Sequence, residues 1–276
     1  MDKEVRLMQL KMLEMIKYID KLCNDNDIEY YLIYGSCLGA IRHKGFIPWD
    51  DDMDIGMTYE NYIKFIDVCK TKLDKNKYFL QTSETEKNYY LSFAKMRDIN
   101  TTLIEKSNKD IDITYGIYID IFPFVGVPDN KIKRKLLKIN RAFTLSANIN
   151  IINNKFLAFI FRFILKIVGK KNILRICTKN CLKYKCSDYD TWSCIFDADG
   201  FECDFTTKDI MGKPKRVKFE DTFLPVPEKY HEYLTYVYGN YMKVPSKEEI
   251  DAKSHTRVVL DLEHGYSEYI KLNKKG

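Results

Sequence analysis

The alternation of apolar and polar positions in the first sixty residues predicts a helix, then a strand, a short helix and a second strand. Apolar residues recur at helical spacing over residues 4–23, which indicates an amphipathic helix. After a polar break, residues 30–34 form a short apolar run rich in β-formers, which is typical of a buried strand. We expect a short helix over 36–43. Acidic and apolar residues then alternate over 52–57, which predicts a strand with its acids on one face.

The remaining pattern predicts a mixed helix and strand protein with a basic helical segment inside it. Residues 130–190 are helical in pattern and contain few acidic residues until their end. We expect an α+β or α/β fold in which residues 1–129 form the core, 130–190 form a basic helical insertion and 191–276 complete the core. The other predicted elements are helices over 59–73 and 228–238, strands over 78–82, 89–97, 101–105 and 116–122, the last stopped by Pro123, and a β-segment over 217–227.

Composition adds little beyond an ordinary soluble class. The 276 residues are 45% apolar and 30% charged, and the net charge of +6 suits partners that carry phosphate or form a membrane surface. A nucleic-acid partner is not expected. The eight cysteines form no CxxC pair, and the spacing of Cys177, Cys181 and Cys186 is wrong for a zinc knuckle. Because the N-terminal stretch is charged throughout, we expect free thiols and a reducing, cytoplasmic location.

One segment is strongly apolar and flanked by bases. Residues 156–168 are interrupted by Arg162 and Lys166, and they are too short for a spanning helix, which needs about 20 apolar residues. One hypothesis is an interfacial helix over 156–171 that rests on anionic lipid at the inner face of the membrane. The alternative is a buried helix that covers the sheet.

Acidic residues in the run DDDMD are the strongest candidates for chemistry. Asp52 and Asp54 would lie on one strand face with their Cα atoms roughly 6–7 Å apart, so that both carboxylates can reach one hard cation. Magnesium favours a few carboxylates, with water and substrate phosphates as its other ligands. The alternative interpretation is an acidic surface turn.

Two other strands bring further groups. Gly35 and Ser36 end the first strand, where small residues let a phosphate approach backbone N–H groups. Asp120 lies between Ile119 and Ile121, and burying a lone carboxylate is costly, so it is either a third active acid or a salt-bridged core aspartate. As an active acid it would complete metal binding or take a proton from the attacking hydroxyl. Together these groups predict a phosphoryl-transfer site.

Basic and aromatic residues are secondary candidates. We expect Arg42 or Lys44, with His43 beside them, to hold a diphosphate, the alternative being an exposed basic turn. Lys95 and Arg97 alternate with Met96, so both can point into one cleft and contact phosphate. The candidates for a base or quaternary ammonium contact are Trp49 and Tyr118, and those for a donor or acceptor phosphate are His255 and Arg257.

Several motifs in order resemble one family. Residues 30–57 read YYLIYGSCLGAIRHKGFIPWDDDMDIGM, residues 95–101 read KMRDINT, 116–123 read GIYIDIFP and 217–242 read VKFEDTFLPVPEKYHEYLTYVYGNYM. These motifs resemble the LicD family, which includes bacterial phosphorylcholine transferases and is related to fukutin and fukutin-related proteins. The resemblance covers residues 1–129 and 215–260, and the insertion matches poorly.

The resemblance implies a nucleotidyltransferase-fold core and a Mg²⁺-dependent phosphotransferase, with Mn²⁺ as a substitute. It implies transfer of phosphocholine from CDP-choline to a sugar of a surface glycan or its lipid-linked precursor, with CMP as the leaving group. Asp52 and Asp54 match the metal-binding pair of the family, and Asp120 matches its third carboxylate. Cys37 departs from the pattern, because an aliphatic residue is expected there, and leaves the acids untouched.

Three alternatives stay open at this point. The donor can be CDP-ribitol or CDP-glycerol, which are chemically equivalent to CDP-choline at the acids. A true nucleotidyltransferase would use the same three acids to attach a nucleotide to a small molecule, a protein or RNA, and would release diphosphate. A non-catalytic scaffold is the third alternative, against which the complete set of acids argues.

Overall fold

A mixed β-sheet forms the body of the molecule. The computed structural model describes residues 2–146, 163–194, 196, 205–246, 248 and 257–273. The main sheet has the order β1-β2-β6-β4-β3; β2 and β6 run parallel, and the other neighbours in this order are antiparallel. The strands of this path are β1 (Tyr31–Leu32), β2 (Asp54–Thr58), β6 (Tyr118–Gly126), β4 (Ala94–Asp98) and β3 (Tyr78–Gln81), and β7 (Thr191–Ser193) and β8 (Phe205–Thr207) extend the sheet beyond β6.

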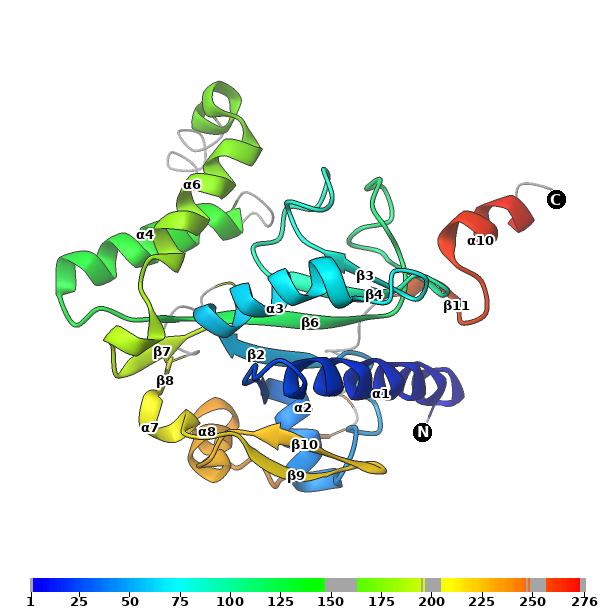
Figure 1. Cartoon of the computed structure of the whole chain (residues 1–276), viewed down its shortest axis with the longest axis horizontal. Helices are drawn as coiled ribbons and strands as arrows, with labels where there is room; N and C mark the ends of the chain where they lie inside the picture. Colours follow the sequence, from blue (N-terminus) through cyan, green and yellow to red (C-terminus); the bar gives the residue numbers. More distant parts are fainter. Residues whose placement is uncertain are drawn as a thin grey trace.

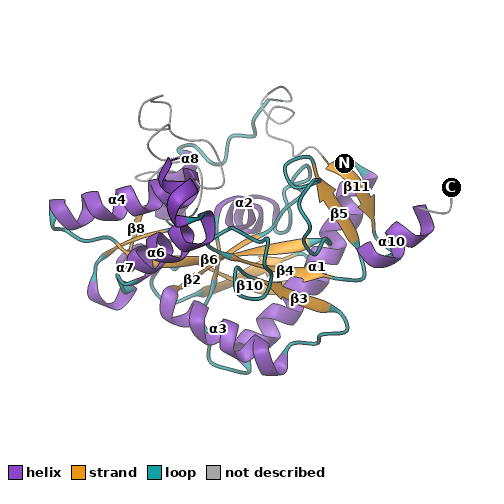
Figure 2. Ribbon diagram, turned by 90° about the horizontal axis from the view of Figure 1, so that it is seen from above, coloured by secondary structure: helices purple, strands orange, loops and turns teal. Residues whose placement is uncertain are grey.

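Helices cover both faces of this sheet. Figure 2 shows α2 (Tyr34–Leu38) and α3 (Tyr59–Lys72) on opposite sides of the strands. The predicted α+β class, a mixed sheet flanked by helices, is therefore confirmed. The remaining elements are the π-helical turn η1 (Gly39–His43), η2 (Cys186–Asp188), α7 (Lys208–Met211), α8 (Tyr230–Tyr238), α10 (Tyr266–Asn273), and two small sheets, one of β9 (Lys215–Phe219) with β10 (Thr222–Val226) and one of β5 (Thr102–Glu105) with β11 (Arg257–Asp261).

The first helix, α1 (Lys3–Asn24), follows the predicted period. Asp2 caps it, because its side chain accepts a hydrogen bond from Glu4 N at 2.9 Å. Met12 and Ile16 of its apolar stripe are buried in the core, whereas Leu7 and Leu10 are each 41% exposed. Figure 1 shows this helix lying alongside the main sheet, where it contacts β6. The helix predicted over residues 4–23 is thus confirmed.

Several strand predictions were wrong at their ends, and the strand predicted over 89–97 begins only at Ala94. The strand predicted over 52–57 begins only at Asp54, so Asp52 lies just before β2. The strand predicted to stop at Pro123 continues to residue 126. Asp120 N donates to Met53 O, on the β2 side of the strand, so the nitrogen of Pro123 faces the β4 side. The pairing with β4 ends at Ile121, and the missing N–H therefore breaks no ladder.

A glycine in β2 permits close packing against β6. A Cβ atom on Gly56 would lie 2.3 Å from Phe124 Cε2 and 3.1 Å from Ile33 Cγ2. We therefore expect Gly56→Ala to lower the free energy of unfolding by about 1–3 kcal/mol, because buried side chains must shift. Urea unfolding checks this value. In a Phe124→Leu background the same change should cost less, and an equal cost in both backgrounds would contradict the account.

The basic segment forms a pair of helices at one end of the sheet, where Leu137 and Cys181 pack in one cluster with Val125 of β6. Figure 1 shows α4 (Lys131–Ser146) and α6 (Lys170–Leu182) projecting from one end of the body. The two helices pack together, and Asn180 Nδ2 donates to Asn140 Oδ1 at 3.2 Å. The boundaries of the predicted insertion stay a prediction. Of the hypothesised interfacial helix, residues 156–162 lie outside the described residues. Within the described ranges, no helix has the length and apolar character needed to cross a membrane.

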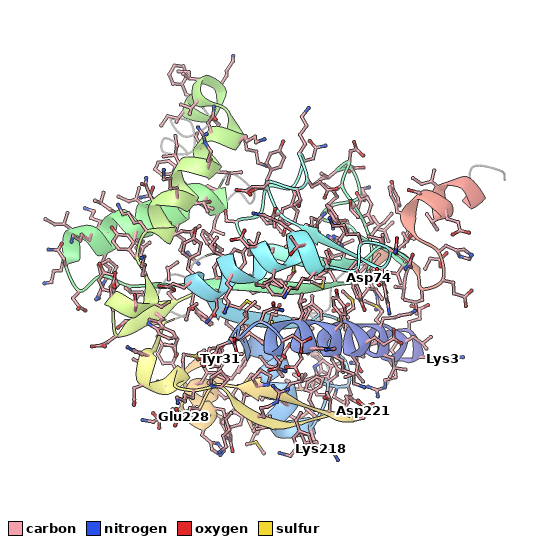
Figure 3. The ribbon with its side chains drawn as sticks, in the orientation of Figure 1. Lys3, Tyr31, Asp74, Lys218, Asp221 and Glu228 are labelled. Carbon is pink, nitrogen blue, oxygen red and sulfur yellow. The ribbon has the colours of Figure 1, made fainter. Side chains whose placement is uncertain are left out.

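The β9–β10 hairpin supports the loop that leads to β2. Glu220 at its turn forms a salt bridge with Arg6 at 2.8 Å and accepts a hydrogen bond from Phe46 N at 3.3 Å. Asp221, labelled in Figure 3, pairs with Lys17 at 2.6 Å. The turn thereby ties the loop that precedes the acidic run to the first helix.

Candidate active site on the β2–β6–β4 face

The register of the two parallel strands brings two predicted acids together. Asp54 of β2 is the direct partner of Asp120 of β6, and Asp120 N donates to Met53 O at 2.9 Å. Paired strands lie about 4.8 Å apart, and direct partners point to the same face of a sheet. Asp54 and Asp120 are therefore neighbours on one face. Asp52 stands two residues before Asp54, at the entrance of the strand.

A third strand adds a cation to the same row. Lys95 of β4 is the direct partner of Asp120 across the antiparallel pair. Its Nζ atom lies 2.6 Å from Asp120 Oδ1 and donates to Oδ2 at 2.9 Å, and the side chains are 9% and 13% exposed. Burial raises the pKa of Asp120, and the Lys95 ammonium opposes that rise. Asp120 is thus a salt-bridged aspartate in this structure, and the phosphate role of Lys95 stays a prediction.

The carboxylate oxygens of these acids are suitable ligands for a divalent cation, but the side chains do not converge on one point. No three His, Cys, Asp or Glu side chains in the described ranges come together closely enough to hold a metal ion. Asp120 Oδ1 is buried, and its contact is the Lys95 ammonium at 2.6 Å. An oxygen in this state can accept a cation. Binding of a metal ion would require the Lys95 ammonium to move away from Asp120 Oδ1. It would also require a second carboxylate to turn toward that oxygen.

The ring of Tyr118 lies close to two cations, Lys95 and Arg97. The ring centroid lies 3.5 Å from Lys95 Nζ and 4.9 Å from Arg97 Cζ. The hydroxyl donates to Glu105 Oε1 at 2.9 Å. A cation over an aromatic face is attracted by the ring quadrupole. The contact with a base or a quaternary ammonium that the sequence suggested for Tyr118 would therefore compete with Lys95.

Arg97 lies deeper than the sequence suggested. Its side chain is 1% exposed, Nε donates to Gln81 Oε1 at 2.6 Å and Nη1 donates to Gly116 O at 2.9 Å. These bonds join β4 to β3 and to the segment before β6. The charge of Arg97 also acts to lower the pKa of Asp120. A direct phosphate contact stays a prediction for this residue.

Gly35 and Ser36 lie against the acidic run at residues 50–54. Ser36 Oγ accepts a hydrogen bond from Asp54 N at 2.9 Å, which fixes the start of β2 beside α2. A Cβ atom on Gly35 would lie 2.8 Å from Asp50 Oδ2, so the absence of a side chain makes room for that carboxylate. Asp50 was missed by sequence reasoning, although it is the first acid of the run at 50–52. The predicted phosphate contact at Gly35 and Ser36 stays a prediction.

The basic turn that follows is held by structural contacts. Arg42 Nη1 donates to Tyr241 O at 2.8 Å, and Arg42 Nε donates to His43 Nε2 at 2.9 Å. Burial lowers the pKa of Arg42, and the negative charge of Asp50 acts against that shift. Arg42 therefore lies at the rim of the acidic region while it fixes the segment after α8.

The other predicted binding residues lie in different settings. Lys44 is exposed, has a left-handed φ of 60° and accepts from Glu220 N through its carbonyl at 2.7 Å. Trp49 is partly buried against the core, with its ring edge-to-face to His43 at 6.0 Å. His255 lies outside the described residues. Arg257 of β11 approaches the acidic run, with Nη1 at 3.8 Å from Asp51 Oδ2.

Tyr238, at the end of α8, is a neighbour of the acids that the sequence did not reveal. Tyr238 is 40% exposed, but burial of its hydroxyl end raises the pKa of that group, and the charges of Asp54, Asp50 and Asp52 raise it further. A protonated hydroxyl is a hydrogen-bond donor. Tyr238 can therefore donate toward a carboxylate or a phosphate at this site. No local sequence signal links α8 to β2, since about 180 residues separate them.

Comparison with known proteins identifies the family of this chain. Residues 27–150 match the family described as LicD/FKTN/FKRP, nucleotidyltransferase domain. The chain is 32% identical over 264 residues to the lipopolysaccharide cholinephosphotransferase LicD of Haemophilus influenzae, covering 91% of this chain and 95% of that protein. An uncharacterised protein of Rickettsia typhi is 43% identical over 56 residues, which cover 20% of this chain and 18% of that protein. The chain belongs to the LicD family.

Proposed function

We propose that this protein transfers phosphocholine from CDP-choline to a sugar hydroxyl of a lipopolysaccharide or a related surface glycan. The observation that carries the proposal is the identity of 32% over nearly the whole length of a relative named as a lipopolysaccharide cholinephosphotransferase. The row of Asp54, Asp120 and Lys95 on one sheet face supports it. A cytoplasmic location suits such a reaction, because CDP-linked donors are soluble nucleotides.

The reaction is a single displacement at phosphorus. The acceptor oxygen attacks the phosphorus that bears choline, on the side opposite the bridging oxygen. The new bond joins the sugar oxygen to this phosphorus, and the bond from phosphorus to the bridging oxygen breaks. CMP leaves with the bridging oxygen and its electron pair. The proton of the sugar hydroxyl passes to a base, for which the carboxylates on the β2–β6 face are the candidates.

Magnesium is the proposed cofactor, although the acids do not converge on one point among the described residues. Asp52, Asp54 and Asp120 would hold it through carboxylate oxygens once the Lys95 ammonium, 2.6 Å from Asp120 Oδ1, moves away. When bound, the ion supplies positive charge to the phosphates and to the leaving group. Lys95 would then exchange its carboxylate for a phosphate oxygen of the donor. Tyr238 would donate a hydrogen bond at the rim of the same region.

A donor panel tests this function. The purified protein, Mg²⁺ and a lipopolysaccharide acceptor are incubated with CDP-choline, CDP-ribitol, CDP-glycerol or CTP, and the nucleotide products are separated by chromatography. We expect acceptor-dependent CMP release with CDP-choline and at least about tenfold less with the other donors, because the head group is held at the reacting phosphorus. CMP release from CDP-ribitol or CDP-glycerol alone would contradict the choline assignment. Diphosphate release from CTP would indicate a nucleotidyltransferase.

A further inference from the structure

Residues 130–187, called the helical arm below, and the rest of the chain, called the body, differ in the sign of their charge. Residues 130–187 contain fifteen Lys and Arg residues and no Asp or Glu, so that the rest of the chain, with the total at +6, carries a net charge of −9. Figure 1 shows that the two helices of this segment, α4 and α6, project from the body. A basic surface on an otherwise acidic protein favours an anionic partner.

The arm also exposes an apolar stripe. Ile132, Leu136 and Ile139 of α4 are 73%, 49% and 40% exposed, and their spacing places them on one face of the helix. Leu137 and Leu145 lie on the opposite face and are buried. Because α6 packs on α4, the inner face of α4 is already occupied, and the apolar stripe is left outward.

Lysines flank this stripe on both sides. Lys131 and Lys135 lie on one side of it and Lys133 on the other, and all three are exposed. A separate helical stretch of the arm has a similar composition, since Phe163 and Ile167 are 58% and 68% exposed and Lys166 is exposed. Exposed apolar groups between lysines suit the boundary between lipid head groups and acyl chains. A soluble polyanion would need the lysines and would leave the apolar groups in water.

We propose that the α4–α6 arm docks the protein on an anionic lipid bilayer, with the lysines on the head groups and the α4 stripe inserted between them. The proposal stands independently of the transferase reaction, since it concerns binding through the arm. It would hold the enzyme at a surface where a lipid-linked acceptor is found. The alternative occupant, a soluble polyanion, is an outcome of the test below.

Vesicle sedimentation with the full-length protein tests the proposal. We expect it to pellet with phosphatidylcholine vesicles that contain about 30% phosphatidylglycerol and to stay in solution with phosphatidylcholine alone. Changing Lys131, Lys133 and Lys135 to Gln should weaken partitioning on the order of 100-fold. A matched control changes Lys75, Lys106 and Lys109 to Gln, which are exposed outside the arm, and should leave partitioning within about threefold.

A second triple variant separates lipid from other polyanions. Changing Ile132, Leu136 and Ile139 to Gln keeps the charge and the helix propensity, and should weaken partitioning at least about tenfold. Failure of the wild type to pellet with the anionic vesicles would overturn the proposal. Equal losses in the two lysine variants would also overturn it. So would unchanged partitioning of the apolar variant together with full competition by heparin, which would assign the arm to a soluble polyanion.

Discussion

Asp54→Asn is expected to lower phosphotransferase turnover by about 1000-fold or more while the protein stays folded. Asn keeps the shape of the side chain but removes the negative charge that a cation needs. Loss of about 4 kcal/mol of transition-state stabilisation corresponds to a rate loss of about 1000-fold. The backbone bond from Asp54 N to Ser36 Oγ is preserved, so that the melting temperature should change little. Turnover is measured as CMP release from CDP-choline.

The matched control is Asp221→Asn. This carboxylate is exposed at the turn of the β9–β10 hairpin, where it pairs with Lys17. Surface ion pairs contribute little to stability, so this variant should keep both its turnover and its melting temperature. If Asp54→Asn retains more than about a tenth of the wild-type turnover, Asp54 is not a catalytic carboxylate.

Lys95→Met is expected to give the largest loss of stability, about 3–5 kcal/mol in the free energy of unfolding. The change leaves Asp120 buried without the ammonium that lies 2.6 Å from its Oδ1 atom. Breaking a buried ion pair is costly because one uncompensated charge remains. Urea unfolding measures the loss. The double variant Lys95→Met/Asp120→Asn should recover most of it, and a loss that persists in the double variant would show that the charge is not the cause.

This loss should depend on pH in a defined direction. Burial raises the pKa of Asp120 above its ordinary value, so the ionised form is penalised in the folded protein. The penalty is fully present above the folded pKa and is lost as the pH falls below the unfolded pKa. Removing Lys95 increases the penalty. The difference between Lys95→Met and wild type should therefore be larger at about pH 7.5 than at about pH 4.5, and a difference that grows on acidification would contradict the pairing.

Local patterns predicted most of the elements near the site. The period of α1, the apolar run of β1 and the alternation of acidic and apolar residues before Met57 each depend on short-range spacing, which a sequence displays directly. The choice of Asp54 and Asp120 also came from such patterns, since each stands between apolar neighbours. Their direct pairing agrees with that choice, although their roles in catalysis stay predictions.

Contacts between distant segments could not be predicted in the same way. The sheet order places β6 between β2 and β4, and neither the order nor the register can be derived from the period of a single strand. The engagement of Lys95 with Asp120 follows only from that register. The position of Tyr238 beside the acids depends on α8 returning from near the end of the chain. The course of β6 through Pro123 depends on where β4 ends.

Titration with Mn²⁺, followed by electron paramagnetic resonance, measures whether the β2–β6 acids bind a divalent cation. Wild type is titrated with and without CDP-choline, beside Asp54→Asn. We predict that wild type binds Mn²⁺, that CDP-choline tightens the binding, and that Asp54→Asn binds at least about tenfold more weakly. Equal Mn²⁺ affinity in wild type and Asp54→Asn, or no binding by wild type, would contradict the account.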